Sequence, residues 1–488
     1  MTFDYDLVII GGSLAGFYAA AAAASLKARV ALVAPAVAAE ASEATIPIST
    51  YRQTLTYLGA IAQQLREAHQ FGIHCTAEEK VGQSVSIRFA EAMQWAADVC
   101  ANLEEQHSLA VLASMGVDAL AGRGQFYPKP YLGFEVKERR LRSRAYLLAT
   151  GSRPAMPEIE GLGATGFLTG DEIAQKSKLK QPPESLIVIG ASPSGVELAQ
   201  TFARLGSRVT LVTKSPHILP KEDPEAALLM QANLEAEGVR ILTKTEVTQA
   251  KRIDEKKWVQ AGNQAIEADE ILLAGEQVPN VESLNLESVG VKWYRKGIQV
   301  NEKLQTTNPH IYACSDFFDG CQMPHLAIYE ADIAVKNSLF LPLFKVDYRG
   351  IPRAVFTDPQ LARVGMTEPQ ALARYGRDNV VVLRQYFKAL AKAQITGQTT
   401  GFCKIIARRN GEILGVSLVG AQAAELIHVF ALAVREKIKV GALASLSCVW
   451  STFSEIARQT AVEWHRYQHQ RHPRILDFLE WFFNWRRH

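Results

Sequence analysis

The sequence predicts an α/β fold in which one unit of strand, glycine-containing turn, helix and second strand occurs twice. The first copy occupies residues 6–33 and the second residues 185–212. In both copies the strands are continuously apolar, which is typical of a parallel sheet covered on both faces. A helix that follows a glycine turn at the end of such a strand is the βαβ arrangement of dinucleotide-binding folds. We therefore expect two Rossmann-like domains, followed from residue 347 by a domain of mixed strands and helices.

The bulk properties fit this architecture and exclude some functions. The 488 residues suffice for roughly three domains, and the content of 48% hydrophobic and 21% charged residues is normal for a globular protein. A net charge of +3 gives no global electrostatic reason to bind nucleic acid. The N-terminus has no basic signal region and no uncharged apolar run is long enough to span a bilayer, so we expect a cytoplasmic protein.

The cysteines predict neither a disulfide framework nor a metal site. They lie far apart along the chain, and no pair has the CxxC or CxxxxC spacing of a redox dithiol. Buried free thiols in a reducing compartment are the expected state for most of the set: Cys75, Cys100, Cys314, Cys321, Cys403 and Cys448.

The glycine turns predict contact with the pyrophosphate of a nucleotide. The GxGxxG template needs a tight bend, close backbone approach and a helix N-terminus that faces the phosphates. Both turns have glycine at its first and last positions and serine at its third, where a small hydroxyl is a further donor. The alternative is that the glycines serve only the packing of helix on strand. The residues are Gly11, Gly12, Ser13 and Gly16 in the first turn and Gly190, Ser192 and Gly195 in the second.

The residue that closes the second strand of each unit usually contacts the ribose. An acidic residue there accepts from a 2′-hydroxyl, and a basic one meets the 2′-phosphate of NADP. The first unit has Ala34 in this place, without the expected carboxylate. The second has Thr213 and Lys214, with His217 nearby, which favours NADPH over NADH. A solvated surface lysine is the competing interpretation of Lys214.

Further motifs make the chain resemble the class I pyridine nucleotide-disulfide oxidoreductases, the group of glutathione reductase, dihydrolipoamide dehydrogenase and mercuric reductase. The resemblance runs from about residue 4 to about residue 465. Its motifs include the ATGSRP stretch at 149–154, GVELA at 195–199, IYACSD at 311–316, and the segments 351–359 and 364–368.

This resemblance implies a homodimer that binds FAD and uses NAD(P)H. Residues 1–150 and 281–345 would form the FAD domain, 151–280 the NAD(P) domain, 346–467 the dimerisation domain and 468–488 an additional tail. It implies FAD contacts at the first turn and at Thr45, Ala149, Thr150, Gly151, Asp316 and Ala327. It implies NAD(P) contacts at the second turn and at Glu197, Lys214 and Gly275.

Within the group, the chain is most similar to the soluble pyridine nucleotide transhydrogenase and dihydrolipoamide dehydrogenase-like branch. The segment 45–47, with Arg52 further on, resembles the TIPSK stretch of the transhydrogenases, in which threonine replaces the second redox cysteine. The segments 387–395 and 420–428 are also similar to this branch.

The chain departs from the family at the groups for dithiol chemistry. The two redox cysteines would fall near Glu40 and on Thr45, and Trp450 takes the place of the catalytic histidine that precedes the retained Glu455. An indole does not exchange a proton at neutral pH. We therefore expect a non-disulfide acceptor: a second nicotinamide, a quinone or another small oxidant. The alternative is a catalytically silent FAD-binding scaffold or redox sensor.

Two further departures concern the nicotinamide side. The lysine that relatives place near the flavin falls on Ser49, and we expect Arg52 to replace it as the cation beside Glu197. With Glu455, these two residues form the predicted catalytic set. Glu276 and Gln277 replace a Gly-Arg pair that lies along the nicotinamide nucleotide in relatives, and a carboxylate there repels phosphate.

The tail at 468–488 lies outside the resemblance. Ile475, Phe478, Leu479 and Phe482 share one helical stripe. The tryptophans 481 and 485 and the arginines 486 and 487 suit a membrane interface, which predicts peripheral contact with the inner face of a membrane. Alternatively, this helix packs on the dimer or caps the flavin cleft.

Overall fold

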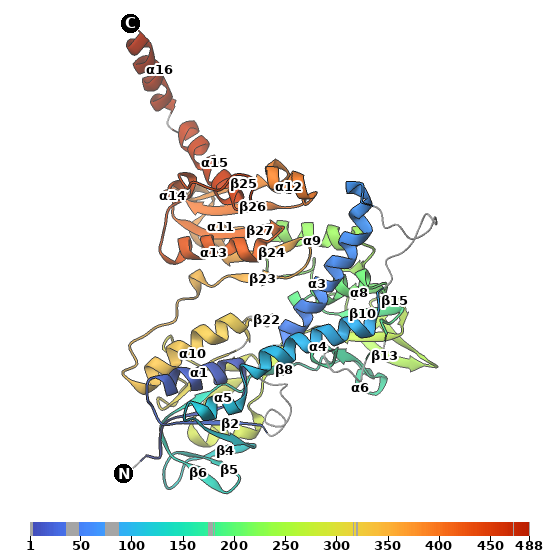
Figure 1. Ribbon diagram of the computed structural model, residues 1–488, viewed down its shortest axis with the longest axis vertical. Helices are drawn as coiled ribbons and strands as arrows, with labels where there is room; N and C mark the ends of the chain where they lie inside the picture. Colours follow the sequence, from blue (N-terminus) through green and yellow to red (C-terminus); the bar gives the residue numbers. More distant parts are fainter. Residues whose placement is uncertain are drawn as a thin grey trace. The chain divides into compact units, whose positions relative to one another are not determined.

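The computed structural model describes residues 3–35, 48–73, 87–173, 179, 181–315, 317–318, 321–471 and 473–487. The chain folds into two compact units (Figure 1). The first comprises Met1–Ser215 and Glu237–Val346, and the second Pro216–Ala236 and Asp347–His488. Within the described residues, no helix is long and apolar enough to cross a membrane.

The first unit contains a five-stranded parallel sheet in which β1 lies between β2 and β7. Its strands, in spatial order, are β20 (Ile311–Ala313), β7 (Ser143–Leu148), β1 (Tyr5–Ile10), β2 (Val30–Ala34) and β3 (Asp118–Ala121). Side chains alternate between two cores, so that Leu7 and Ile9 face helices α1 (Leu14–Ser25) and α10 (Pro324–Leu339). Val8 and Ile10 join the other core with Phe126. The expected parallel sheet with two covered faces is confirmed.

The face with Val8 and Ile10 is covered by irregular structure and by a small antiparallel sheet. That sheet consists of β4 (Gly124–Tyr127), β5 (Gly133–Val136) and β6 (Arg139–Leu141). The residues between Val281 and Val291 pack on the same core. The chain therefore returns to this sheet after residue 280, which is what places β20 at its edge.

A second parallel sheet repeats the arrangement, with β10 between β11 and β16. Its strands are β12 (Arg240–Leu242), β11 (Arg208–Val212), β10 (Ser185–Ile189), β16 (Glu270–Leu273) and β9 (Leu168–Thr169). Helix α8 (Pro193–Arg204) follows β10. An antiparallel sheet shares the core of Ile187 and Ile271: β13 (Val247–Ile253), β14 (Lys256–Ala261) and β15 (Gln264–Ala268). The two copies seen in the sequence therefore fold alike.

Helices α3 (Ile48–Glu67), α4 (Phe89–Glu105) and α5 (Leu109–Ser114) complete the first unit, with α6 (Leu162–Thr165) and α7 (Gly170–Ile173). Helix α3 packs along α8, where the hydroxyls of Thr56 and Thr201 lie 3.1 Å apart. Two short strands, β8 (Ser152–Pro154) and β17 (Gln277–Pro279), pair where the chain passes between the parallel sheets.

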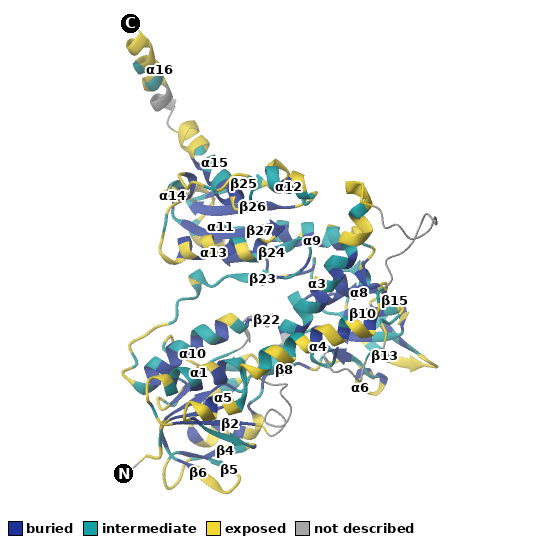
Figure 2. Ribbon diagram, in the orientation of Figure 1, coloured by how far each residue is buried: buried dark blue, intermediate teal, exposed yellow. Residues whose placement is uncertain are grey.

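The second unit is built on an antiparallel five-stranded sheet, as the expected α+β domain requires. The strands are β23 (Arg353–Val355), β24 (Gln360–Gly365), β27 (Ile413–Gly420), β26 (Phe402–Arg408) and β25 (Val380–Tyr386). Its helices are α9 (Pro224–Ala236), α11 (Glu368–Tyr375), α12 (Ala391–Thr396), α13 (Ala423–Arg435), α14 (Val440–Ala444), α15 (Glu455–Arg471) and α16 (Pro473–Arg487). Figure 2 shows the strands largely buried and α16 largely exposed.

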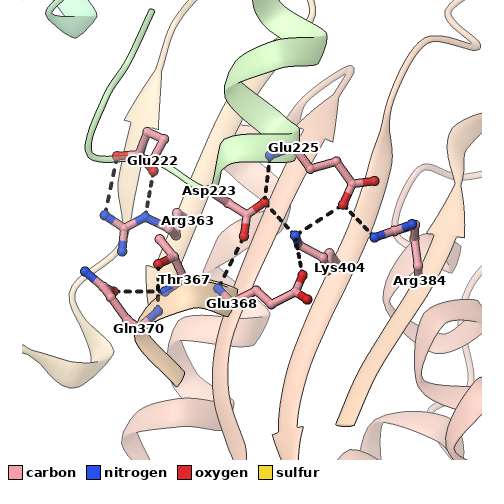
Figure 3. A network of polar contacts seen from close by, with 9 residues as sticks. All are labelled: Glu222, Asp223, Glu225, Arg363, Thr367, Glu368, Gln370, Arg384 and Lys404. Atoms are coloured by element: carbon pink, nitrogen blue, oxygen red, sulfur yellow. Dashed lines mark hydrogen bonds and ion pairs between the residues drawn. The ribbon is translucent and has the colours of Figure 1, made fainter. Parts of the chain in front are cut away.

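Helix α9 belongs to this unit although it follows β11 in the chain, and a buried ionic network fastens it there (Figure 3). The ammonium of Lys404 on β26 lies 2.5 Å from a carboxylate oxygen of Asp223, 3.0 Å from Glu368 and 3.2 Å from Glu225. Although burial lowers the pKa of Lys404, the hydrogen bonds to Asp223 and Glu368 outweigh it and hold the pKa above its usual value. Lys404 is therefore charged, and Asp223 has a partner despite complete burial.

Two arginines of the second unit extend the network. Arg363 is 2.6 Å from Glu222, with both side chains about 7% exposed, and Arg384 is 2.5 Å from Glu225. Three cations thus face the acidic start of α9 across strands of the sheet (Figure 3). Opposite charges that are desolvated together hold a segment in one register, because any shift leaves a buried charge unpaired.

We predict that Lys404→Met destabilises the protein by about 3–5 kcal/mol, because it leaves Asp223 buried without its cation. Methionine keeps much of the side-chain volume, so the decrease in the free energy of unfolding results mainly from removal of the positive charge. The measurement is the denaturation midpoint followed by circular dichroism. Arg466→Ala is the matched control, since its pair with Glu463 is exposed and contributes about 1 kcal/mol or less. Equal midpoints for the two variants would contradict the prediction.

Candidate nucleotide and redox site

The first glycine turn is a backbone-to-backbone contact. Gly11 has a φ of +118°, and a Cβ added to it would lie 2.0 Å from the carbonyl oxygen of Ala149. Its N–H donates to Val33 at 2.8 Å. A Cβ on Gly16 would meet the Gly11 carbonyl oxygen at 2.2 Å. Only glycine satisfies both positions, so the turn brings the N-terminus of α1 directly to the ends of β1 and β7.

Ser13 caps α1 instead of extending its hydroxyl to a ligand. The hydroxyl accepts from the Gly16 N–H and donates to the carbonyl oxygen of Ala149 at 2.8 Å. Its proton is therefore already used, and the expected extra donor to phosphate is not presented. In the described part of the chain, by contrast, no hydrogen bond uses the backbone N–H groups of Gly12 and Ser13. These amides at a capped helix N-terminus suit a pyrophosphate, which fits FAD.

The second turn has the same construction. Gly190 has a φ of +110°, and its Cβ would lie 2.4 Å from the carbonyl oxygen of Ala274, next to Gly275. Ser192 caps α8 by accepting from the Gly195 N–H, and its hydroxyl lies 3.0 Å from that of Ser194. This N-terminus likewise fits a dinucleotide, although Pro193 at the first helical position has no N–H to donate.

Arg52 and Glu197 form an ion pair in the first unit. The Nε of Arg52 lies 2.5 Å from a carboxylate oxygen of Glu197, with side-chain exposures of 12% and 2%. The packing of α3 along α8 brings them together, 145 positions apart in the chain. Among the described residues, no side chain pairs with the two terminal guanidinium nitrogens of Arg52. The cation is thus oriented by one carboxylate, and the N–H groups of its two terminal nitrogens remain for a ligand.

Asp171, which was not among the predicted site residues, interacts electrostatically with Arg52 of this ion pair. It lies in the first turn of α7, and burial raises the pKa of its carboxyl group above the ordinary value, opposed by the charge of Arg52 and reinforced by Glu172. A carboxylate that is desolvated beside a single cation is a common feature of functional sites. The adjacent acidic residues directly after β9 were the available signal in the sequence.

We predict that Asp171→Asn stabilises the protein at pH 7 and not at low pH. The pKa of Asp171 is raised in the folded state, so its ionisation costs stability above that pKa, and the cost is absent below the ordinary value of 3.8. The expected rise in Tm at pH 7 is about 1–3 °C. Thermal unfolding at pH 7 and at the lowest pH the fold tolerates measures it, with the exposed Asp477→Asn as control. A Tm gain that is equal at both pH values would refute it.

Lys214 lies two residues after the end of β11 and pairs with Glu246 at 2.5 Å, with side-chain exposures of 72% and 58%. Lys214 is therefore exposed, as expected for a solvated surface lysine, but its ammonium group is paired with a carboxylate. In the first unit, Ala34 is buried and its carbonyl oxygen accepts from the Gly122 N–H at 2.7 Å. The methyl side chain of Ala34 therefore offers no hydrogen-bond acceptor to a ribose hydroxyl, as the sequence predicts.

The stretch 149–151 is tied to the loop that begins at Gly275. The side-chain amide of Asn280 donates to the Thr150 carbonyl oxygen, and its backbone N–H donates to that of Gly151. Glu276 in this loop is exposed, and the Oε1 of Gln277 is buried without a hydrogen-bond partner in the described part of the chain. Neither provides the positive charge that favours phosphate.

Trp450 and Glu455 lie in the second unit and face different environments. The Trp450 side chain is 76% exposed, whereas Glu455 at the start of α15 is 3% exposed. A carboxylate oxygen of Glu455 accepts from the backbone N–H of Ser451, whose φ is +64°. Glu455 therefore stabilises the turn from which the Trp450 side chain extends into solvent. Because its hydrogen-bond donor is a backbone N–H group, this contact does not require a histidine at position 450.

The remaining predicted FAD residues are placed as follows. Ala327 in α10 is fully buried in the core shared with α1, and its N–H donates to the Met323 carbonyl oxygen. Thr45 and Asp316 lie outside the described residues. The site roles of all these residues stay predictions.

Comparison with known proteins agrees with this geometry. The family model described as pyridine nucleotide-disulphide oxidoreductase matches residues 5–335, and the model of its dimerisation domain matches residues 351–461. The mercuric reductase of Staphylococcus aureus is 30% identical over 93% of this chain and 81% of its own. A dihydrolipoyl dehydrogenase of Bacillus subtilis is 31% identical over 86% of this chain and 90% of its own.

Solved structures are also similar. The copper(II) complex of the HOCl-induced flavoprotein disulfide reductase RclA of Escherichia coli superimposes with a TM-score of 0.79 at 25% identity, covering 95% of this chain and 99% of that one. The LpdA protein of Mycobacterium tuberculosis has a TM-score of 0.82 at 24% identity, covering 94% and 99%, and supports the fold. The chain belongs to the pyridine nucleotide-disulphide oxidoreductase family and carries that family's dimerisation domain.

Proposed function

We propose that this protein is a homodimeric, FAD-dependent NAD(P)H oxidoreductase whose acceptor is not a disulfide. The family supplies the use of FAD and NAD(P)H. The proposal of a non-disulfide acceptor rests on the sequence: no two cysteines have the spacing of a redox dithiol, and Trp450 occupies the place of the catalytic histidine. Of the relatives above, the dihydrolipoyl dehydrogenase is named for a dithiol substrate, and the proposed acceptor differs from that substrate.

The thiol environments support this proposal. Burial raises the pKa of Cys403 to about 12 and that of Cys100 to about 11, and it also raises the pKa of Cys448. Thiols with such values are protonated at neutral pH, and the thiolate is the reactive form. These three cysteines are therefore poor candidates for a dithiol relay. A second nicotinamide, a quinone or another small oxidant needs no thiolate, and the transhydrogenase resemblance favours the first of these.

The residues of this chain would divide the work as follows. The N–H groups of Gly12 and Ser13 bind the FAD pyrophosphate at the start of α1, and the Gly190 turn binds that of NAD(P)H. Bound FAD supplies the two-electron chemistry between nicotinamide and acceptor. Arg52 would hold a fixed positive charge that stabilises the negative charge built up during reduction, and Glu197 would orient it.

NADPH is the proposed reductant because Lys214 lies two residues after β11, the strand whose end selects between the two nucleotides. Its pairing with Glu246 holds the ammonium in place before the nucleotide binds. The same carboxylate also partly neutralises the positive charge of Lys214, which would weaken the attraction for the 2′-phosphate. Glu246→Gln distinguishes the two, since it weakens NADPH binding if the pair positions Lys214 and strengthens it if the pair only neutralises the charge.

Anaerobic titration tests the function. We predict that NADPH bleaches the oxidised flavin band of the purified protein, and faster than NADH, with the preference lost in Lys214→Ala. A subsequent acceptor screen should restore the band with nicotinamide analogues or quinones and not with lipoamide or glutathione disulfide. A band that persists under excess NADPH and NADH would instead favour the catalytically silent scaffold. A purified protein without flavin would contradict both.

We predict that Arg52→Ala slows flavin reduction by about 10- to 100-fold, because the positive charge beside Glu197 is lost. Stopped-flow measurement of band loss after mixing with NADPH gives the rate. Arg52→Lys, which keeps a cation, should recover part of it. Flavin content per chain checks that each variant still binds FAD. An unchanged reduction rate in a fully loaded Arg52→Ala protein would remove Arg52 from the mechanism.

A further inference from the structure

Helix α16 is a 15-residue helix that presents large aromatic side chains to solvent. Phe478, Trp481 and Trp485 are 58%, 60% and 64% exposed, and Phe483 is 50% exposed. Of residues 477–487 none is buried, and the buried core of the second unit extends along α15 only as far as Trp464. So much aromatic surface on one short element is not needed for the packing of the described fold.

The aromatic residues gather on one side of the helix. Phe478, Trp481, Phe482 and Trp485 follow the spacing i, i+3, i+4 and i+7, and their rings are in contact: Phe478 with Trp481 at 5.7 Å and Phe482 with Trp485 at 6.1 Å between centroids. Leu479 and Phe483 form the adjacent row by the same spacing. The result is one broad apolar face, which we call the aromatic face of α16.

Both acidic residues within 477–487 lie away from the aromatic face, on the side where Arg487 donates to Asn484. Asp477, Glu480 and Asn484 share the opposite, polar side, because they are spaced i, i+3 and i+7. Within residues 477–487, the only charged group on the aromatic face is Arg486, whose guanidinium lies 5.9 Å from the centroid of Phe482. The exposed Arg471 ends the preceding helix. A surface that docks here meets cationic and aromatic groups, while both carboxylates point away from it.

We propose that the aromatic face of α16 docks on the surface of an anionic lipid bilayer, with the helix lying in the plane of the interface. Indole rings are favoured at the headgroup level, where their apolar body and N–H both find suitable surroundings. An arginine beside them extends its guanidinium to lipid phosphate while its stem stays on the apolar side. The helix attaches to the surface and does not cross it, which agrees with the lack of a spanning helix among the described residues.

The chemistry of the face favours lipid over a second copy of the chain. Two identical aromatic faces in contact would bring two Arg486 cations into the same apolar layer, without the carboxylates of α16 to neutralise them. They would also bury indole N–H groups against a face that offers no acceptor. A bilayer interface supplies phosphate and carbonyl acceptors for both groups.

The test is co-sedimentation of the FAD-containing full chain with vesicles of phosphatidylcholine alone or mixed with phosphatidylglycerol. We predict binding to the mixed vesicles that weakens with added salt, and much weaker binding to phosphatidylcholine alone. Trp481→Ala with Trp485→Ala should lower the partition coefficient about tenfold or more, since it removes most of the indole contact. Arg486→Gln should lower it about fivefold on the anionic vesicles only.

Glu480→Gln with Asn484→Ala is the matched control on the polar side of α16 and should not weaken binding. Flavin content and circular dichroism check that the variants fold, which is expected because none of these side chains belongs to the core. Equal sedimentation of the wild type and the double tryptophan variant would overturn the proposal. So would a lower mass of that variant in sedimentation velocity without lipid, because the face would then bind a second copy.

Discussion

Both nucleotide turns depend on a close backbone approach that leaves no room for a side chain. The carbonyl oxygen of Ala149 occupies the space of a Cβ on Gly11, and that of Ala274 occupies the equivalent space at Gly190. In each case the neighbouring parallel strand ends against the turn, and both glycines adopt a positive φ that other residues avoid. A helix N-terminus is thereby held over the ends of two strands, an arrangement that suits the binding of a pyrophosphate.

The position of the ion pair follows from this constraint. Because the Gly190 turn fixes the start of α8, it also fixes Glu197 one turn further along the helix. Helix α3 packs against α8, so Arg52 meets the carboxylate from a distant part of the sequence. The Ser192 cap sets the same helix in place from its first turn. The Arg52–Glu197 pair is thus positioned by the same backbone contact that forms the second glycine turn.

The features predicted from the sequence are those with local backbone causes. Gly11 and Gly190 are visible because no other residue fits, and the apolar strands are visible because both faces of a parallel sheet are buried. The direction of the Ser13 hydroxyl was not predictable, since a capping contact and a phosphate contact require the same residue. The positions of Asp171 and Glu246 depend on helix packing and loop geometry, which leave no periodic signal. The ionic contacts of α9 with the second unit come from Lys404, Arg363 and Arg384, single cations on three different strands.

The residues predicted to bind nucleotides and those predicted to transfer protons differ in how far they depart from the motifs of the resemblance. In the first unit, the glycine turns have the predicted tight geometry, and Arg52 pairs with Glu197. In the second unit, Trp450 stands at the position predicted for the catalytic histidine, and Glu455 accepts a hydrogen bond from the backbone N–H of Ser451. A carboxylate used in this way stabilises a turn whether or not a histidine precedes it. Retention of Glu455 beside Trp450 is therefore explained by structure, and it gives no reason to expect proton transfer at that position.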